Sequence, residues 1–197
     1  MINGDYVIFE KLNIEHVRKM KHWGIHTSPL FRDYNFIFRN DDERRNFLYQ
    51  KTFSPFNQYY AIIYINEVIG FLGMKKINYI TKNSTLGLVL NPDLVGLGYG
   101  TVVLSKFLNF YFNVKNMKKM ELEVAGYNPR ARKLYEKMGF KEVKSYLEPY
   151  PNRYIDEKSP EYLEFKDEFV KGKHDRMYNY IYKMELEKEE FKFELCY

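Results

Sequence analysis

The spacing of apolar and polar residues predicts a short strand and two helices in the first part of the chain and mainly strands after residue 58. Near the N-terminus, Tyr6 to Phe9 predicts a short strand, and Ile14 to Trp23 carries apolar residues at helical spacing. Asp41 to Tyr49 predicts a second helix, with Asp41 as its N-cap and more acidic residues in the first turn. Residues 24–40 contain many aromatic side chains and a proline, so we expect a loop between these helices.

After residue 58 the pattern changes to that of β-strands. Tyr59 to Ile65 and Val68 to Ile77 are rich in β-branched and aromatic residues, and Asn66-Glu67 between them suits a two-residue hairpin turn. The remaining pattern predicts strands at 85–90, 120–124, 140–145 and 177–186, and helices at 100–112 and 129–138.

Two segments complete the predicted organisation. Residues 146–173 contain prolines and show no period, so we expect an irregular insert. Residues 191–197 alternate again, which predicts an edge strand or an oligomer contact and leaves a homodimer open. The order of elements predicts a mixed α/β fold rather than a doubly wound dinucleotide fold. We interpret residues 1–197 as one domain with a C-terminal extension at 187–197.

Composition excludes several classes of protein. With 45% hydrophobic and 29% charged residues, the chain is typical neither of disordered nor of membrane-spanning proteins. Cys196 is the only cysteine, which rules out an internal disulfide and favours a cytoplasmic location. The net charge of +5 is spread along the chain rather than clustered, so we expect neither a nucleic-acid partner nor a membrane.

The first chemical motif is a run of alternating glycines between a predicted strand and a predicted helix. Gly96, Gly98 and Gly100 precede the helix, whose first N–H groups lack partners and can bind an anion such as a pyrophosphate. A flexible strand-to-helix turn is the simpler interpretation of these glycines alone. A Walker loop is excluded because Gly-Lys-Ser/Thr is missing, and the dinucleotide pattern needs a glycine where Thr101 stands.

The second motif is the helix predicted at 129–138. Asn128 suits the N-cap, Pro129 suits the first helical position, and Gly139 suits the residue after the helix. One face of this helix is apolar and consists of Ala131, Leu134, Tyr135 and Met138. Spacing alone therefore favours a core role for Tyr135.

Taken together, Gly96-Leu-Gly-Tyr-Gly-Thr101 and Asn128-Pro-Arg-Ala-Arg-Lys-Leu-Tyr-Glu-Lys-Met-Gly-Phe140 resemble the motifs of the GNAT acetyltransferase family. The resemblance extends over about residues 5–186. It implies a mostly antiparallel sheet of about seven strands, flanked by helices and splayed between the strands at 85–90 and 120–124. It also implies acetyl-CoA as co-substrate and the transfer of its acetyl group to an amine.

The resemblance also implies roles for individual residues. The backbone of Leu88 to Leu90 is expected to flank the pantetheine and the thioester, and Asn128 to contact the pantetheine arm. The N–H groups of residues 96–101 are expected to hold the pyrophosphate, and Tyr135 to lie near the sulfur. The implied cofactor-binding residues are Leu88, Val89, Leu90, Val95, Gly96, Leu97, Gly98, Tyr99, Gly100, Thr101, Asn128 and Ala131. Val95 departs from the family, which usually carries Arg or Gln there, and the strand at 85–90 lacks the glutamate found in many members.

The reaction needs a neutral amine and a proton for the departing thiolate. We take Tyr135 as the general acid. The base is left open between Glu123, His174, Asp175 and deprotonation through water. His22 and His26 have the spacing of two metal ligands on a helix, but Gly24 lies between them and no third ligand is evident, so we expect no metal site.

The acceptor side is predicted to involve the loop at 24–40 and the insert. Candidate lining residues are Trp23, His26, Phe31, Arg32, Tyr34, Tyr146, Glu148, Tyr150 and Tyr154. The motifs are similar to the branch with ribosomal-protein and spermidine acetyltransferases, which implies a peptide N-terminus or a small primary amine. An acidic pocket formed by Glu148, Asp156, Glu157 and Glu161 would favour a polyamine. A non-catalytic acyl-CoA sensor and a binding domain for polyanions remain as alternatives.

Overall fold

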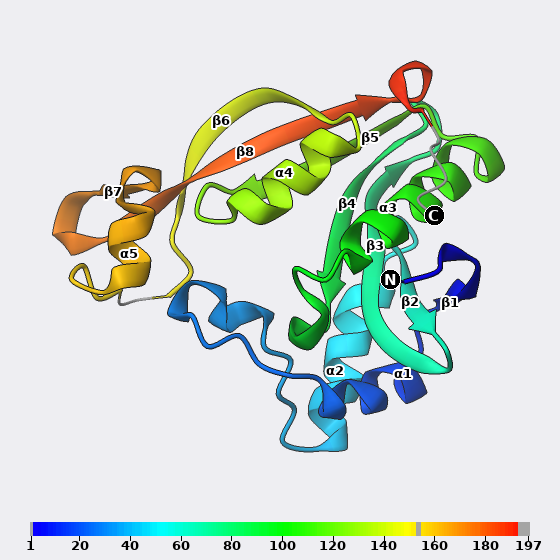
Figure 1. The fold of residues 1–197 in the computed structure, drawn as a ribbon, viewed down its shortest axis with the longest axis horizontal. Helices are drawn as coiled ribbons and strands as arrows, with labels where there is room; N and C mark the ends of the chain where they lie inside the picture. The colour runs from blue at the N-terminus through cyan, green and yellow to red at the C-terminus, as the bar shows by residue number, and fades with distance from the viewer. Residues whose placement is uncertain (1, 153–154, 193–197) are drawn as a thin grey trace.

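A computed structural model describes residues 2–152 and 155–192 of the chain. The described residues form an eight-stranded sheet in the order β1-β2-β3-β4-β5-β8-β6, with β7 paired to β8 (Figure 1). The strands are β1 (Val7–Lys11), β2 (Gln58–Tyr64), β3 (Glu67–Asn78), β4 (Asn83–Leu90), β5 (Lys119–Ala125), β6 (Lys141–Pro149), β7 (Phe169–Lys171) and β8 (Met177–Glu187). The α-helices are α1 (Ile14–Lys19), α2 (Asp41–Thr52), α3 (Tyr99–Asn109), α4 (Pro129–Lys137) and α5 (Pro160–Glu164). This arrangement confirms the predicted mixed α/β fold with a mostly antiparallel sheet.

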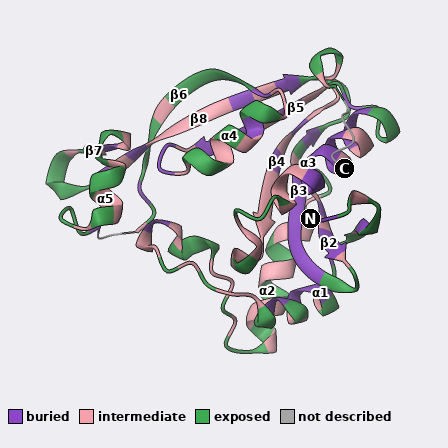
Figure 2. Cartoon of the chain, in the orientation of Figure 1, coloured by how far each residue is buried: buried purple, intermediate pink, exposed green. Residues whose placement is uncertain are grey.

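Helices cover both faces of the sheet because successive apolar side chains of its central strands point to opposite faces. On β2 and β3, Ile62 and Leu72 pack with α3 and α4 in the main core. The neighbouring Ala61 and Phe71 point to the opposite face, where they pack with α1 and α2. Figure 2 shows that burial is concentrated in β3 and α3, whereas the segment around α5 and β7 is mostly exposed.

The sheet opens between β4 and β5, which form a parallel pair. Their pairing runs only from Asn83–Lys119 to Thr85–Glu121. Beyond it, β4 continues to Leu90 and β5 to Ala125 without pairing to each other. The backbone groups on the facing edges of these strand ends are therefore not used in the sheet, and the splay predicted from the family resemblance is present.

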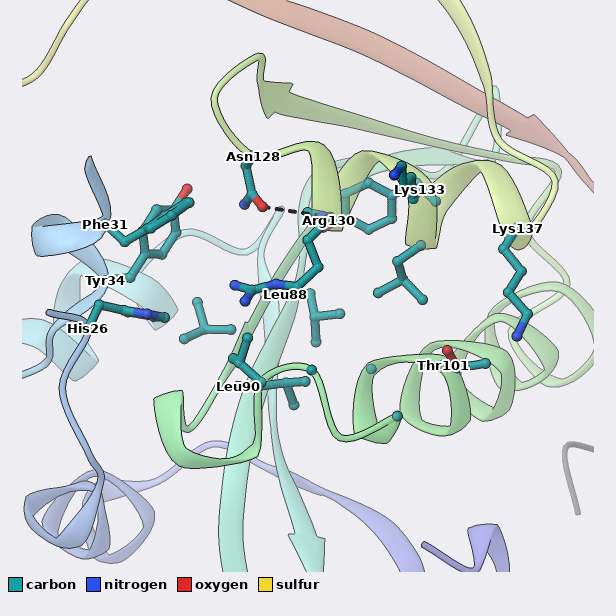
Figure 3. A pocket seen from close by; sticks show the side chains of 18 residues that line it. His26, Phe31, Tyr34, Leu88, Leu90, Thr101, Asn128, Arg130, Lys133 and Lys137 are labelled. Atoms are coloured by element: carbon teal, nitrogen blue, oxygen red, sulfur yellow. Dashed lines mark hydrogen bonds between the residues drawn. The ribbon is translucent and has the colours of Figure 1, made fainter. Parts of the chain in front are cut away.

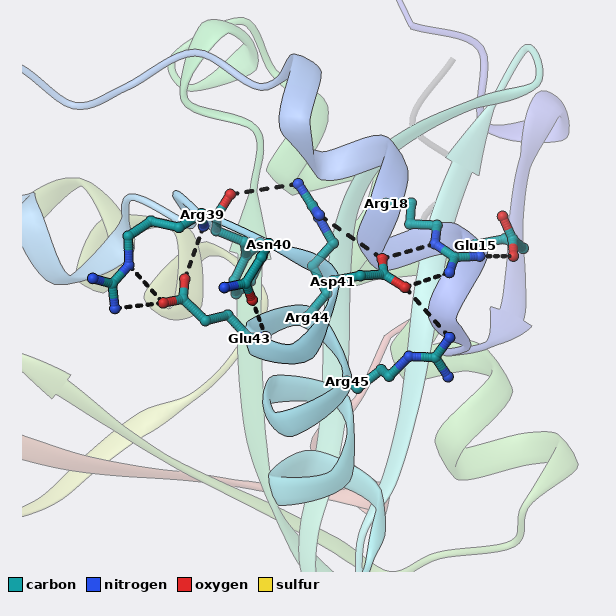
Figure 4. A network of polar contacts seen from close by, with 9 residues as sticks. Glu15, Arg18, Arg39, Asn40, Asp41, Glu43, Arg44 and Arg45 are labelled. Carbon is teal, nitrogen blue, oxygen red and sulfur yellow. Dashed lines mark hydrogen bonds and ion pairs between the residues drawn. The ribbon is translucent and has the colours of Figure 1, made fainter.

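The elements α1 and α2 are held together by a polar network (Figure 4). The Nε of Arg18 donates to Oδ1 of Asp41 at 3.0 Å, and a second guanidinium nitrogen binds Oδ2 of the same carboxylate. The N-cap of α2 is Asn40, whose side chain accepts a hydrogen bond from the N–H of Glu43 at 2.9 Å. The prediction of Asp41 as the N-cap was therefore wrong by one residue, because Asp41 serves as the ion-pair partner of Arg18.

Two other local predictions need correction. The β2–β3 hairpin turns at Ile65-Asn66, whose φ angles are 47° and 64°, and not at Asn66-Glu67. The segment 146–173 is not irregular throughout, since 146–149 extends β6 along β8 and the remainder contains α5 and β7. The predicted edge strand at 191–197 falls largely outside the described residues, as does Cys196.

Candidate active site

A cavity of about 380 Å³ lies at the splay. Its walls come from the end of β4, the glycine loop, the start of α3, the length of α4 and the segment at 26–34 (Figure 3). The lining residues are His26, Phe31, Tyr34, Leu88, Val89, Leu90, Val95, Gly96, Gly98, Gly100, Thr101, Asn128, Arg130, Ala131, Lys133, Leu134, Tyr135 and Lys137. Most of the cofactor-binding residues predicted from the sequence thus lie together around one space.

The glycine loop presents backbone donors to this cavity. Gly96 and Gly98 have φ angles of 87° and 85°, a left-handed conformation that side chains other than glycine adopt at a cost. Gly98 is the N-cap of α3 and has no side chain to satisfy the first N–H groups of the helix. The N–H groups of Gly98, Tyr99 and Gly100 have no carbonyl acceptor inside the helix, so they can donate to an anion.

A third glycine of the loop serves packing. A Cβ atom at Gly100 would lie 3.0 Å from Cδ2 of Leu134 on α4 and 3.6 Å from Cδ1 of Leu90. Glycine at this position therefore lets the first turn of α3 approach α4 across the cavity.

Basic side chains of α4 give one end of the cavity a positive charge. Figure 3 shows Lys133 and Lys137 at the same end as Thr101, which belongs to the first turn of α3. Together with the helix N-terminus, these ammonium groups suit a ligand that carries several phosphates. These lysines also supply positive charge that an arginine in place of Val95 would otherwise provide.

The N-terminus of α4 is capped as predicted. The Oδ1 of Asn128 accepts a hydrogen bond from the N–H of Ala131 at 3.2 Å, and Pro129 starts the helix. Gly139 follows the helix with a φ of 94°. The side-chain nitrogen Nδ2 of Asn128 has no hydrogen-bond partner among the described residues, so it can donate to a ligand in the cavity.

Tyr135 lines the cavity from α4. Its ring packs edge-on against Phe140 at a centroid distance of 5.8 Å, and the residue is only 9% exposed. Its hydroxyl makes no hydrogen bond with another described residue. Burial, with a smaller effect of Tyr34, raises the pKa of Tyr135 above its ordinary value of 10. The hydroxyl is therefore protonated at neutral pH and can donate to a ligand.

The opposite end of the cavity is formed by the segment between α1 and α2. His26, Phe31 and Tyr34 lie there in Figure 3, and the guanidinium of Arg130 extends from α4 toward them. The rings of His26 and Phe31 are 5.6 Å apart, and those of His26 and Tyr34 are 6.5 Å apart. Burial, followed by the charge of Arg130, lowers the pKa of His26 below 6.5.

Several residues predicted for the site have side chains outside the cavity. Leu97 is 63% exposed, and Tyr99 packs edge-on against Tyr64, so neither side chain lines the cavity; the contact predicted for both was through the backbone. Among the candidates for the acceptor side, Trp23 stacks on Phe71 in the core and donates its indole N–H to Val68. The others that do not line the cavity are Arg32, Tyr146, Glu148 and Tyr150, and Tyr154 is outside the described residues.

The candidate bases have other contacts. Glu123 accepts a hydrogen bond from the hydroxyl of Tyr146 at 2.7 Å on the sheet. His174 and Asp175 form a 3₁₀ turn before β8, where Asp175 lies 3.5 Å from the ammonium of Lys171. None of the three lines the cavity. In the described part of the chain, no cluster of three or more His, Cys, Asp and Glu side chains could hold a metal ion.

Sequence reasoning missed three basic lining residues, Arg130, Lys133 and Lys137. Their spacing of three and four places them along one face of α4, and the motif itself gave the register of that helix. The signal was available, but a basic helix face is more often simply exposed to solvent.

Residues 24–140 match the model of the acetyltransferase (GNAT) family, which is more than half of the chain. The chain belongs to the GNAT family. Members of this family use acetyl-CoA as co-substrate, and the loop and helix that face the cavity both lie within the matched region. The resemblance inferred from the two motifs is therefore confirmed.

Two curated relatives match about half of this GNAT chain. Spermidine N(1)-acetyltransferase of Vibrio cholerae serotype O1 is 32% identical over 102 residues, which cover 51% of the chain and 59% of the relative. An uncharacterized N-acetyltransferase of Methanocaldococcus jannaschii is 31% identical over 94 residues, which cover 45% and 58%. The matches thus span under two thirds of the length of these relatives.

Solved structures share the fold over nearly the whole chain. A chimera of the spermidine N-acetyltransferase SpeG from Vibrio cholerae and hSSAT has a TM-score of 0.68 at 18% identity, covering 93% of this chain and 96% of that one. The Vibrio cholerae spermidine N-acetyltransferase in complex with CoA and spermine has a TM-score of 0.64 at 17% identity, covering 94% and 98%. In the described residues, no helix is long and apolar enough to cross a membrane.

Proposed function

We propose that the chain transfers an acetyl group from acetyl-CoA to a primary amine. One observation carries this proposal: the cavity at the splay is lined by a glycine loop with free backbone donors, by basic residues of α4 and by a protonated tyrosine. The pyrophosphate would lie on the N–H groups of Gly98, Tyr99 and Gly100, with Lys133 and Lys137 near the phosphates. Pantetheine would follow β4 from Leu90 toward Leu88, beside the amide of Asn128.

The chemistry follows from this placement. Backbone N–H groups on the unpaired edge of β4 would stabilise the oxyanion that forms when the amine attacks the thioester. Tyr135 would donate its proton to the departing thiolate, and its raised pKa keeps that proton in place before the reaction. The attack is direct, because no cysteine or serine lines the described cavity to accept the acetyl group first.

Spermidine is the first acceptor to test, because the curated relative of known substrate is a spermidine acetyltransferase. The acidic pocket expected for a polyamine does not line the cavity, since Glu157 pairs with Lys171 at 2.9 Å and Asp156 caps its own turn. A different carboxylate lies near the acceptor end. After burial, the charge of Asp33 contributes to the raised pKa of the adjacent Tyr34, but Asp33 does not line the cavity and Arg130, which does, carries the opposite charge.

The test measures CoA release from acetyl-CoA with spermidine, spermine, other small amines and peptides with a free N-terminus. Calorimetry measures acetyl-CoA binding in parallel. The proposal expects binding and release with at least one class of amine, with the acetylated product identified by mass spectrometry. Binding without release for every amine would instead favour a non-catalytic sensor, and the absence of both would overturn the assignment of the cavity.

A further inference from the structure

We infer that His26 is the base that removes a proton from the acceptor ammonium, an inference that rests on the proposed function. The residue lies at the end of the cavity opposite the phosphate-binding loop, where the amine would enter (Figure 3).

The cavity requires a base that does not come from β4. A primary ammonium with a pKa near 10.4 must lose a proton before it can attack a carbonyl. The described lining contains no aspartate or glutamate. Its titratable side chains are His26, Tyr34, Arg130, Lys133, Tyr135 and Lys137. Histidine alone in this group has a neutral form at pH 7 that accepts a proton readily.

The backbone of His26 is fixed by one side chain. The N–H of His26 donates to Oδ1 of Asn35 at 2.7 Å, and Nδ2 of Asn35 donates to the carbonyl of His26 at 3.1 Å. This reciprocal pair closes the segment into a loop. It therefore fixes the backbone at His26 and leaves both ring nitrogens unused.

A second contact docks the same segment against the end of β4. The N–H of Gly24 donates to Oδ1 of Asn91 at 3.1 Å, directly after the strand. A Cβ atom at Gly24 would lie 2.0 Å from Oδ1 of Asp93, so a larger residue would require the Asp93 carboxylate to move. The two contacts together place His26 beside Leu88–Leu90, along which the thioester would lie.

The surroundings of the imidazole favour its neutral form. Its ring packs against Phe31 and Tyr34, and no hydrogen bond to a ring nitrogen is formed by the described residues. Arg130 of α4 is the charged group that acts on it, and burial with that charge lowers the pKa of His26. Tyr34 beside it has a raised pKa and stays uncharged, so it does not offset the charge of Arg130.

The protons and electrons balance with His26 in this role. A ring nitrogen of His26 takes one proton from the ammonium and later releases it to solvent. The neutral amine attacks the carbonyl carbon, the new N–C bond forms and the C–S bond breaks, and the thiolate takes the hydroxyl proton of Tyr135. The second proton lost by the nitrogen, relayed by water, restores Tyr135. The net products are the amide, CoA thiol and one proton in solution.

The test compares His26→Gln with His22→Gln, because His22 is exposed and does not line the cavity. With an amine that the wild type acetylates, we expect His26→Gln to lower kcat/KM at pH 7 by about 10²-fold. The loss should shrink as the pH rises toward the pKa of the amine. Imidazole added to the buffer should restore part of the rate, and His22→Gln should resemble the wild type.

The pH profile separates a base from a structural role. In the wild type, kcat/KM should decrease as the pH drops below the lowered pKa of His26. This decrease at low pH should be absent in His26→Gln. An active wild type with a His26→Gln variant of unchanged rate and profile would overturn the inference and leave the proposed function intact. A wild type that binds acetyl-CoA but acetylates no amine would remove the proposed function, and the inference with it.

Discussion

Single side chains give the two ends of the cavity different chemistry. At one end, Lys133 and Lys137 project from α4 near the backbone donors of the glycine loop, an arrangement suited to phosphates. At the other end, His26 and Tyr34 form an aromatic surface with polar atoms but no fixed negative charge in the described lining. Tyr135 also lines the cavity. Arg130 adds a positive charge at this second end, so only the first end combines basic side chains with the backbone donors that suit phosphates.

The basic end gives a prediction at the scale of one residue. Lys137→Gln should raise the Kd for acetyl-CoA about three- to tenfold, because one charge-assisted contact with a phosphate is lost. Calorimetry at low and high salt would measure this, and the difference from wild type should shrink at high salt. Lys141→Gln is the matched control, since Lys141 pairs with Glu190 outside the cavity. Equal affinities for Lys137→Gln and wild type would contradict the placement of the phosphates.

At the scale of elements, capping and turn rules explain what could be predicted. The α4 motif was found because Asn128, Pro129 and Gly139 each satisfy a local rule for a helix end, and the structure has all three in these places. The pairing of β6 with β8 could not be predicted, because the residues of β6 are nearly all exposed and do not alternate between buried and exposed positions. His26 was only one of many candidates, because its position depends on Asn35 and Asn91, which lie 9 and 65 residues away in the sequence.

One hairpin turn offers a test of backbone strain. Ile65 is 63% exposed with a φ of 47°, which is unfavourable for a β-branched residue. Ile65→Asn should stabilise the protein by about 1 kcal/mol, because asparagine tolerates this conformation and suits such a turn. Urea unfolding would measure the change. Ile80→Asn is the control, since Ile80 is 94% exposed and has no positive φ. An equal effect of both substitutions would show that lost surface hydrophobicity, and not strain, is responsible.

At the scale of the whole molecule, the region beyond the splay is held by β5, β6 and β8. On one face of β5 and β8, two lysines alternate with two glutamates in a closed network. The ammonium of Lys119 lies 3.1 Å from Glu185 and 3.4 Å from Glu121, and that of Lys183 lies 3.0 Å and 3.1 Å from the same two carboxylates. These side chains are only 19 to 28% exposed. The network therefore links β5, which forms one side of the splay, to β8.

The network makes the stability of the whole fold depend on pH. Burial acts to raise the pKa of Glu185, but hydrogen bonds from Lys183 and Lys119 outweigh it, and the pKa is lowered from 4.5. A carboxyl with a lowered pKa in the folded state stabilises the protein above its unfolded pKa, and this contribution is lost as the pH falls below about 4.5. Glu185→Gln should cost about 1 kcal/mol at pH 7 and less at pH 3.

Urea unfolding at both pH values would measure this, with Glu187→Gln as the control, since Glu187 is exposed on the same strand. A loss at Glu185→Gln that is equal at pH 7 and pH 3 would argue against a role of the ionised network.

The most direct test of the account follows a labelled acetyl group from acetyl-CoA to spermidine in the wild type and in Tyr135→Phe. The account predicts labelled N-acetylspermidine from the wild type, and a kcat about 10²-fold lower for Tyr135→Phe with an unchanged Kd for acetyl-CoA, because phenylalanine keeps the contact with Phe140 but lacks the proton. Equal kcat values for the two proteins would contradict the role of Tyr135. Failure of the wild type to label spermidine or any other primary amine, while it binds acetyl-CoA, would contradict acetyl transfer at this site.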